Sequence, residues 1–196
     1  MSRILLTGGR APVALELARQ FAAGGATVVV ADSTSHWLTR ASGAVERAYH
    51  APSPRERPHA FAAAIADIVH RERITRIVPT CEEVFYLAGC SAALRQITEL
   101  FCPSLDVLRA LHNKWRLRRL AAGLGVEVPP AWLLRSRADL AHLPLRPQDL
   151  VFKPVFSRFA VHTLVRPRPQ ALLRVRPTPE QPWLAQRYVA GRELCS

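Results

Sequence analysis

The sequence predicts an α/β protein in two parts, a parallel sheet flanked by helices and then a smaller α+β lobe. Arg3–Thr7 and Ala26–Ala31 are short apolar runs of the kind found in buried parallel strands, and a helical pattern over Ala11–Ala23 separates them. In the second part, the apolar run Leu150–Phe152 is expected to pair with Val161–Val165 as a hairpin.

The opening of the chain has the order strand, glycine turn, helix, strand, aspartate. Gly8-Gly9 follow the first strand and Asp32 follows the second, which is the order of a Rossmann-like unit with a helix N-terminus available to an anion. A dinucleotide site needs G-x-G-x-x-G, but residues 8–14 read GGRAPVA and have no glycine at the later positions. Asp32 fits a turn as well as a ribose contact.

The rest of the first part is expected to continue as loop, helix and strand. Ser35–Pro58 is polar and contains prolines, so it is predicted to be mostly loop. A helix is expected over His59–Arg73, a third strand over Ile74–Pro79, a helix over Val84–Arg95 and a short fourth strand over Glu99–Cys102.

A domain boundary is expected near Ser104, which gives domains of residues 1–104 and 105–196. Beyond the hairpin, the second domain is expected to contain further short elements: helical Ser104–Ala110, His112–Leu124, Ser136–His142 and Pro169–Val175, and strands Ala131–Leu134 and Trp183–Val189.

Lys153 is one of only two lysines in the chain and stands at the end of the apolar run in the second domain. An ammonium group at a strand end can reach a phosphate without being fully desolvated. Pro154 stops regular pairing, and Ser157 and Arg158 add a hydroxyl and a guanidinium in the next turn. The strand that carries Lys153 and the strand Trp183–Val189 are interpreted as the two walls of a nucleotide cleft. The alternative is that Lys153 is a surface lysine in an ordinary hairpin.

Three motifs in the right order resemble the ATP-grasp superfamily. A helix that opens with Asn113-Lys114 is followed by the letters LGVEVP, Lys153-Pro154 stands on a strand, and residues 186–193 read QRYVAGRE. The last motif is similar to the family pattern Q/E-x-Y/F-V/I-x-G-x-E. The resemblance extends over the whole chain, and TGGRAPVALELA resembles the carbamoyl-phosphate-synthase-like and biotin-carboxylase-like branch.

The resemblance implies a Rossmann-like pre-ATP-grasp domain and the small nucleotide lobe of an enzyme that activates a carboxylate as an acyl phosphate, which an amine or other nucleophile attacks. It also implies the ATP-binding residues. Lys114 and Lys153 would contact the phosphates, and Ser157 and Arg158 would lie in a phosphate-covering loop that lacks the usual glycines. Gln186 would contact the adenine amino group, Glu193 the ribose, and the adenine edge would be contacted by Arg187, Tyr188 and Val189.

The first domain contributes to substrate binding in this family, so Arg10, Glu82 and Glu83 are candidate substrate residues. Glu82 and Glu83 follow the third strand, where open parallel sheets bind ligands, and could hold an amine or a metal. The alternative is that they cap the next helix, which is the more frequent role of acidic residues at this position.

In the family, the Mg²⁺ ligands and the transition-state arginine follow the hinge strand. No catalytic residue and no metal ligand is therefore expected in these 196 residues, which are predicted to be an inactive, truncated portion of an enzyme that uses ATP, Mg²⁺ and a small carboxylate. The final strand is expected to leave a bare edge with Trp183, Leu184, Tyr188 and Val189 exposed, and a homodimer or aggregate to form there.

Composition disfavours other classes. The formal net charge is +12, but the basic residues are almost all arginines scattered along the chain, without a basic block interleaved with aromatics, so a nucleic-acid partner is not expected. No apolar run approaches the roughly 20 residues of a membrane helix. The four cysteines lack paired metal spacing and are expected to be reduced thiols in a cytoplasmic protein.

Two alternatives remain. One is a non-catalytic module that binds a nucleotide or a partner. The other is an NAD(P)-binding oxidoreductase or epimerase, which is disfavoured by the broken glycine pattern and because no tyrosine precedes a lysine at the spacing Tyr-x-x-x-Lys.

Overall fold

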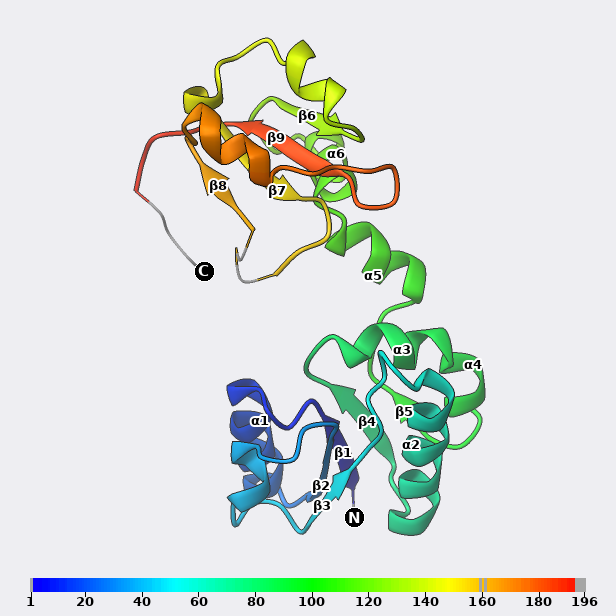
Figure 1. Ribbon diagram of the computed structural model, residues 1–196. Helices are drawn as coiled ribbons and strands as arrows, with labels where there is room; N and C mark the ends of the chain where they lie inside the picture. Colours follow the sequence, from blue (N-terminus) through cyan, green and yellow to red (C-terminus); the bar gives the residue numbers. More distant parts are fainter. Residues whose placement is uncertain (1, 159, 161, 193–196) are drawn as a thin grey trace. The chain divides into compact units, whose positions relative to one another are not determined.

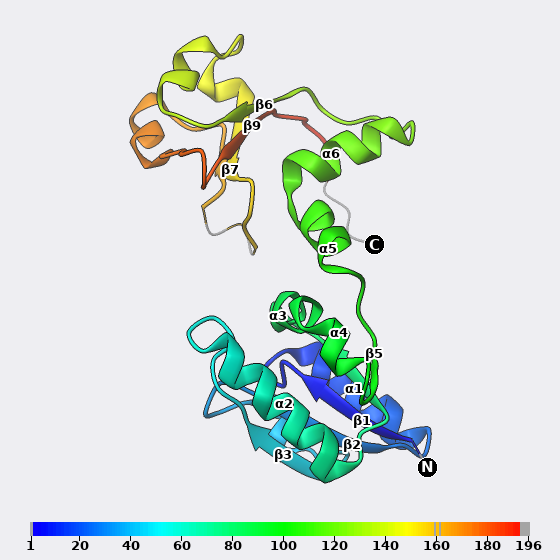
Figure 2. The same ribbon diagram turned by 90° about the vertical axis from the view of Figure 1, so that its right-hand side faces the viewer.

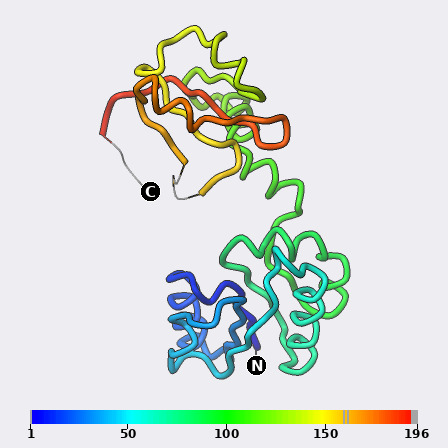
Figure 3. Tube along the Cα trace, viewed as in Figure 1, coloured from blue at the N-terminus to red at the C-terminus, as the bar shows by residue number. Residues whose placement is uncertain are grey.

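The computed structural model describes residues 2–158, 160 and 162–192. The chain divides into two compact units, Met1–Leu108 and Arg109–Ser196, which it passes through in sequence order (Figures 1 and 3). The division falls within helix α5 (Leu105–His112). The assignment of residues 1–104 and 105–196 to two functional domains stays a prediction.

The first unit is built on a five-stranded parallel sheet with the strand order β3-β2-β1-β4-β5. The strands are β1 (Arg3–Thr7), β2 (Thr27–Asp32), β3 (Arg47–His50), β4 (Arg76–Pro79) and β5 (Glu99–Leu100). In the central register, Leu5 of β1 lies between Val29 and Ile77. The predicted α/β class is thus confirmed for this unit.

Helices cover both faces of this sheet (Figure 2). Helix α1 (Pro12–Ala23) packs Ala18 on the face formed by residues such as Ile4, and α2 (Pro58–Glu72) packs Ile65 on the opposite face. Because both faces are covered, β1 and β2 are apolar along most of their length, and this is why they could be found in the sequence.

Ser35–Pro58 is mostly loop, as predicted, but it also contains a 3-10 helix, η1 (Leu38–Ala41), and the edge strand β3, whose half-exposed sequence RAYH lacks an apolar run. One expectation for this unit was wrong. The supposed helix Val84–Arg95 is broken at Cys90 into α3 (Glu83–Gly89) and α4 (Ser91–Leu94).

A buried carboxylate ties the end of α2 to the strands. Glu72 accepts hydrogen bonds from Arg3 Nη2 at 2.9 Å, from Arg47 Nη1 at 3.3 Å and from the Tyr49 hydroxyl, although its side chain is only 4% exposed. The hydrogen bond from Tyr49, together with the two arginines, lowers the pKa of Glu72 from its usual value.

Glu72→Gln is therefore expected to destabilise the protein by about 1–3 kcal/mol at pH 7, because buried donors lose a charged acceptor. Since the folded-state pKa is lowered, this contribution is complete above the unfolded-state value of about 4.3 and is lost as the pH falls through the folded-state value. Urea unfolding at pH 7 and near pH 3 measures it. Glu16→Gln, on an exposed part of α1, is the control; an equal Glu72→Gln effect at both pH values would contradict the role of charge.

The second unit contains a four-stranded antiparallel sheet of order β6-β9-β7-β8. Its elements are α6 (Lys114–Gly123), β6 (Ala131–Leu134), β7 (Leu150–Pro154), β8 (Leu164–Val165), β9 (Trp183–Arg187) and the 3-10 helices η2 (Ala138–His142), η3 (Pro147–Asp149) and η4 (Pro169–Arg174). Phe152, Leu134 and Val175 are buried on one face of the sheet. This confirms the predicted smaller lobe.

The expectation of a bare edge at the final strand was wrong. Strand β9 lies between β6 and β7, so both of its edges are paired. Trp183 and Leu184 are buried and Tyr188 is half-buried, which leaves Val189 as the exposed apolar side chain of the four, at 63%. The two stretches taken as opposite walls of a cleft are instead neighbouring strands of one sheet, and the predicted route to self-association through β9 has no basis.

Among the described residues, we find no helix with the length and apolar character needed to cross a bilayer. Cys81, Cys90 and Cys102 are free thiols, and burial raises the pKa of each; Cys195 lies outside the described residues.

Candidate nucleotide-binding site

The position of Lys114 is set by the start of α6. Asn113 is the N-cap residue, and its side chain accepts a hydrogen bond from the backbone N–H of Arg116 at 2.9 Å. The backbone N–H of Lys114 then donates to the carbonyl of Val155 at 3.2 Å. This bond joins the helix N-terminus to the chain just after β7.

The Lys114 ammonium group lies against the turn that follows β7. Its Nζ donates to the Ser157 carbonyl oxygen at 2.6 Å and to Ser157 Oγ at 3.0 Å. Ser157 Oγ is in turn 3.3 Å from the carbonyl oxygen of Pro154. The structure thus brings Lys114 and Ser157 together, and the sequence alone did not predict this contact.

Lys153 extends from β7 close to Lys114. Burial lowers the pKa of both lysines, and for Lys114 the positive charge of Lys153 lowers it further. In the ranges 2–158, 160 and 162–192, neither ammonium group forms an ion pair with a carboxylate. Two neighbouring, partly desolvated cations without a paired anion are chemically suited to bind a polyanion.

Gln186 lies on the same face of the sheet as Lys153. Lys153 is opposite Leu184, and Val151 is opposite Gln186, in the β7–β9 register. Residues directly opposite in antiparallel strands share a face, and so do residues two apart on one strand. The Gln186 amide therefore lies on the same sheet face as Lys153, in a diagonal position across the two strands.

The chain after β9 lines a hollow of about 530 Å³, together with residues 127–130. The backbone N–H groups of Arg187 and Tyr188 are bonded to the carbonyls of Pro130 and Asp149, both at 2.9 Å, so this stretch is held on both sides. The Arg166 guanidinium lies 5.0 Å from the centre of the Tyr188 ring. Arg187, Tyr188 and Val189 all line this hollow, whereas the two lysines do not.

Arg158 lies exposed in the turn after Ser157. Glu193, expected at the ribose, lies outside the described residues.

The candidate substrate residues gather at the carboxyl edge of the parallel sheet in the first unit. Asp32 accepts the Arg10 backbone N–H at 2.7 Å and Arg10 Nη1 at 2.9 Å. This pair fixes the guanidinium so that Nη2 lies 3.8 Å from an oxygen of Glu82 and 3.8 Å from one of Glu83. The sequence placed Asp32 at a turn but gave no signal for its bond to Arg10.

Glu83 has a structural as well as a candidate binding role. Its buried Oε1 accepts from the Thr7 hydroxyl at 2.8 Å and from the N–H groups of Thr80 and Cys81 at 3.2 and 3.1 Å, so it holds the turn before α3. Its Oε2 has no hydrogen-bond partner within the described part of the chain.

The glycine turn after β1 is filled by protein. A Cβ at Gly9 would lie 2.5 Å from the Trp37 ring, and one at Gly8 would lie 2.7 Å from Thr80 Oγ1. A dinucleotide pyrophosphate would need this space, and the Asp32 carboxylate expected on its ribose is already bound to Arg10. The geometry disfavours an NAD(P) site.

No group of three or more His, Cys, Asp or Glu side chains able to hold a metal occurs among the residues that the structure describes.

The chain therefore combines a parallel α/β unit with a second unit built on an antiparallel sheet. No family model matches the sequence, and no curated protein does. Solved structures of ATP-grasp enzymes, however, match both units along nearly the whole chain. The chain has this fold.

Three of these structures illustrate the likeness. The L-amino acid ligase from Bacillus licheniformis has a TM-score of 0.72 at 16% identity, over 97% of this chain and 45% of that one. The N5-carboxyaminoimidazole synthetase from Staphylococcus aureus, complexed with ADP, has a TM-score of 0.71 at 13% identity, over 96% and 48%. The biotin carboxylase domain dimer of the Hydrogenobacter thermophilus 2-oxoglutarate carboxylase, with MgADP, ADP and bicarbonate, has a TM-score of 0.68 at 14% identity, over 95% and 44%.

The chain thus spans less than half the length of each of these proteins. At these identities, the likeness establishes the fold.

Proposed function

We propose that the chain is the ATP-binding portion of an ATP-grasp ligase, which activates a small carboxylate as an acyl phosphate for attack by an amine or another nucleophile. The observation that carries this proposal is the pair of neighbouring ammonium groups, Lys114 of α6 and Lys153 of β7. Lys153 lies on the sheet face that also presents Gln186. Phosphoryl transfer depends on neutralising and positioning the transferred phosphate, and two fixed cations supply both effects.

The proposed contacts are those that the resemblance to ATP-grasp enzymes implies. Lys114 and Lys153 bind the phosphates, Ser157 and Arg158 cover them, and Gln186 accepts from the adenine amino group. The backbone of Arg187–Val189, fixed on both sides, reads the adenine edge, and Glu193 holds the ribose. Because Lys114 already bonds Ser157, we expect nucleotide binding to reorganise that turn.

For the substrate, we propose Arg10, Glu82 and Glu83 in the first unit. The Arg10 guanidinium, fixed by Asp32, can bind a carboxylate. The more exposed Glu82 can accept from an amino group, while the buried Glu83 carboxylate lies 3.8 Å from Arg10 Nη2 and helps to hold the guanidinium. Mg²⁺ is proposed as the companion of ATP, with ligands other than the residues described.

Nucleotide preference tests the proposal. In calorimetric titrations, ATP and ADP are expected to bind more tightly than GTP or NADH, because the predicted edge contacts are specific for adenine and the turn after β1 is filled. Tighter binding of NADH than of ATP would contradict the assignment of the chain as an ATP-binding portion.

Turnover is a separate expectation. We expect the 196-residue chain alone, supplied with Mg²⁺, to release no phosphate from ATP above background, because the described residues offer no metal ligand set. A phosphate-release assay measures this directly, and Mg²⁺-dependent turnover by the chain alone would show that its own residues do hold the metal.

A further inference from the structure

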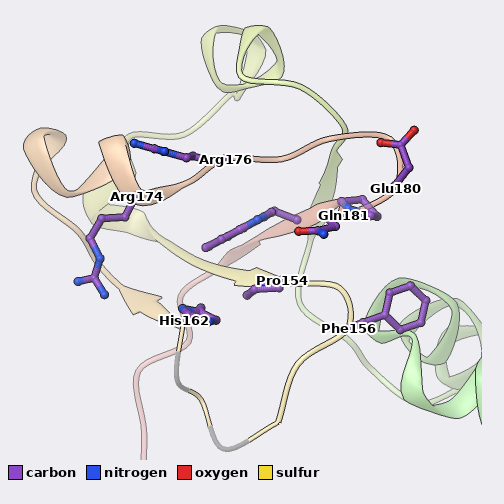
Figure 4. A pocket seen from close by; sticks show the side chains of 9 residues that line it. Pro154, Phe156, His162, Arg174, Arg176, Glu180 and Gln181 are labelled. Atoms are coloured by element: carbon purple, nitrogen blue, oxygen red, sulfur yellow. The ribbon is translucent and has the colours of Figure 1, made fainter. Parts of the chain in front are cut away.

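A second hollow, of about 420 Å³, lies beside the start of β9 (Figure 4). Across β7 and β9, Lys153 is opposite Leu184 and Pro154 is opposite Trp183. Successive residues of a strand point to opposite faces, so Pro154 and Trp183, which line this hollow, are on the other face from Lys153. The hollow is therefore separate from the proposed nucleotide site, and its volume is in the range of about 300–1,000 Å³ common for small-molecule sites.

One wall of the hollow is apolar, flat and stiff. The Trp183 side chain, 9% exposed, is anchored in the core beside Phe152, and Pro154 and Pro182 border it. Proline has a fixed φ, and a core tryptophan has little rotamer freedom, so this wall does not have to be ordered by a ligand. Such a surface favours a planar apolar group.

The opposite rim carries two arginines, Arg174 and Arg176 (Figure 4). Val175 between them is completely buried, which fixes the backbone that presents both side chains. Arg176 Nε makes only a 3.5 Å contact with the carbonyl of Leu173, and neither guanidinium is ion-paired with any carboxylate in the described ranges.

The remaining polar groups leave the hollow cationic at one end. His162 lies on the same side as Arg174 in Figure 4, whereas the Glu180 carboxylate is at the other end. The end of the hollow that carries the two arginines therefore has more hydrogen-bond donors than acceptors. A guanidinium is matched to a carboxylate by two parallel hydrogen bonds.

We propose that this hollow binds a small organic carboxylate with a planar, aromatic body. The ring packs against Trp183 and the prolines, and the carboxylate is held by Arg174 and Arg176. This site does not depend on the nucleotide site, since it lies on the other face of the sheet and uses neither lysine.

Calorimetric or ligand-observed NMR titration of the 196-residue chain with 2-naphthoate and with the neutral 2-naphthamide tests the proposal. Naphthoate is expected to bind at least about tenfold more tightly than the amide, because only the carboxylate forms charge-assisted hydrogen bonds. Replacing both Arg174 and Arg176 by Ala is expected to remove this preference. Replacing both by Lys keeps the positive charge but not the two parallel hydrogen bonds of a guanidinium, and is expected to reduce the preference.

Two controls make the result specific. The double variant Arg19→Ala and Arg55→Ala removes the same charge from exposed positions in the first unit and is expected to keep the preference. Lys153→Met, which lowers ATP affinity if the proposed function is right, is expected to leave naphthoate binding unchanged. Three results would each overturn the proposal. The first is equal affinity for naphthoate and naphthamide, and the second is an equal loss of naphthoate affinity in the two double Ala variants. The third is a loss of naphthoate affinity in Lys153→Met.

Discussion

Replacing Lys153 by Met is expected to weaken ATP binding by about 1–3 kcal/mol, the range for hydrogen bonds to charged groups. The reason is that Lys153 is a partly buried ammonium group whose only proposed partner is a phosphate. Adenosine has no phosphates and should bind with unchanged affinity. Calorimetric titration of both ligands against the parent chain and the variant measures the difference.

Lys114→Met is expected to show a similar loss for ATP, because this lysine is the second cation of the pair. Arg119→Met, which removes one positive charge from the exposed surface of the same helix, is the matched control and is expected to cost much less. If either lysine variant lost ATP and adenosine affinity equally, that lysine would hold the lobe together instead of binding phosphate.

The largest expected loss of stability comes from Gly8→Ala. Gly8 has a φ of +76°, and an added Cβ would lie 2.7 Å from Thr80 Oγ1 and 2.8 Å from Glu83 Oε1. The left-handed conformation costs a non-glycine residue about 1–2 kcal/mol, and overpacking adds about 1–3 kcal/mol. Urea unfolding of the variant measures the sum.

Gly25→Ala separates these two effects. Gly25 has a similar φ of +81°, but nothing lies within 4 Å of an added Cβ, so only the backbone cost is expected. Equal losses in the two variants would mean that the turn after β1 relaxes around a methyl group, and it would weaken our conclusion that this turn is filled by protein.

The sequence was most informative where burial is continuous along a strand. β1 and β2 have helices on both faces, so their apolar runs identified them, whereas β3 is a half-exposed edge strand and was taken for loop. The order of strands in the sheet could not be predicted from local pattern. The pattern located β9 but gave no information on its neighbours, so the prediction of a bare edge was wrong.

In the candidate site, too, local motifs could be read from the sequence, whereas contacts between distant residues could not. Lys114 and Lys153 were found by their motif positions, and Asn113 as the start of a helix. The Lys114–Ser157 contact, the Arg10–Asp32 pair and the packing of Trp37 on Gly9 join residues far apart in the sequence, and no local signal marks them. Such contacts depend on tertiary packing, which spacing does not encode.

The most direct measurement is a map of backbone amide chemical shifts during titration of the 196-residue chain with ATP. We expect the largest changes at Lys114, Lys153 and Gln186–Val189, and little change near Gly8 and Asp32. Changes confined to Gly8 and Asp32, with the lysine strand and the chain after β9 unaffected, would contradict the assignment of the second unit as the nucleotide-binding lobe.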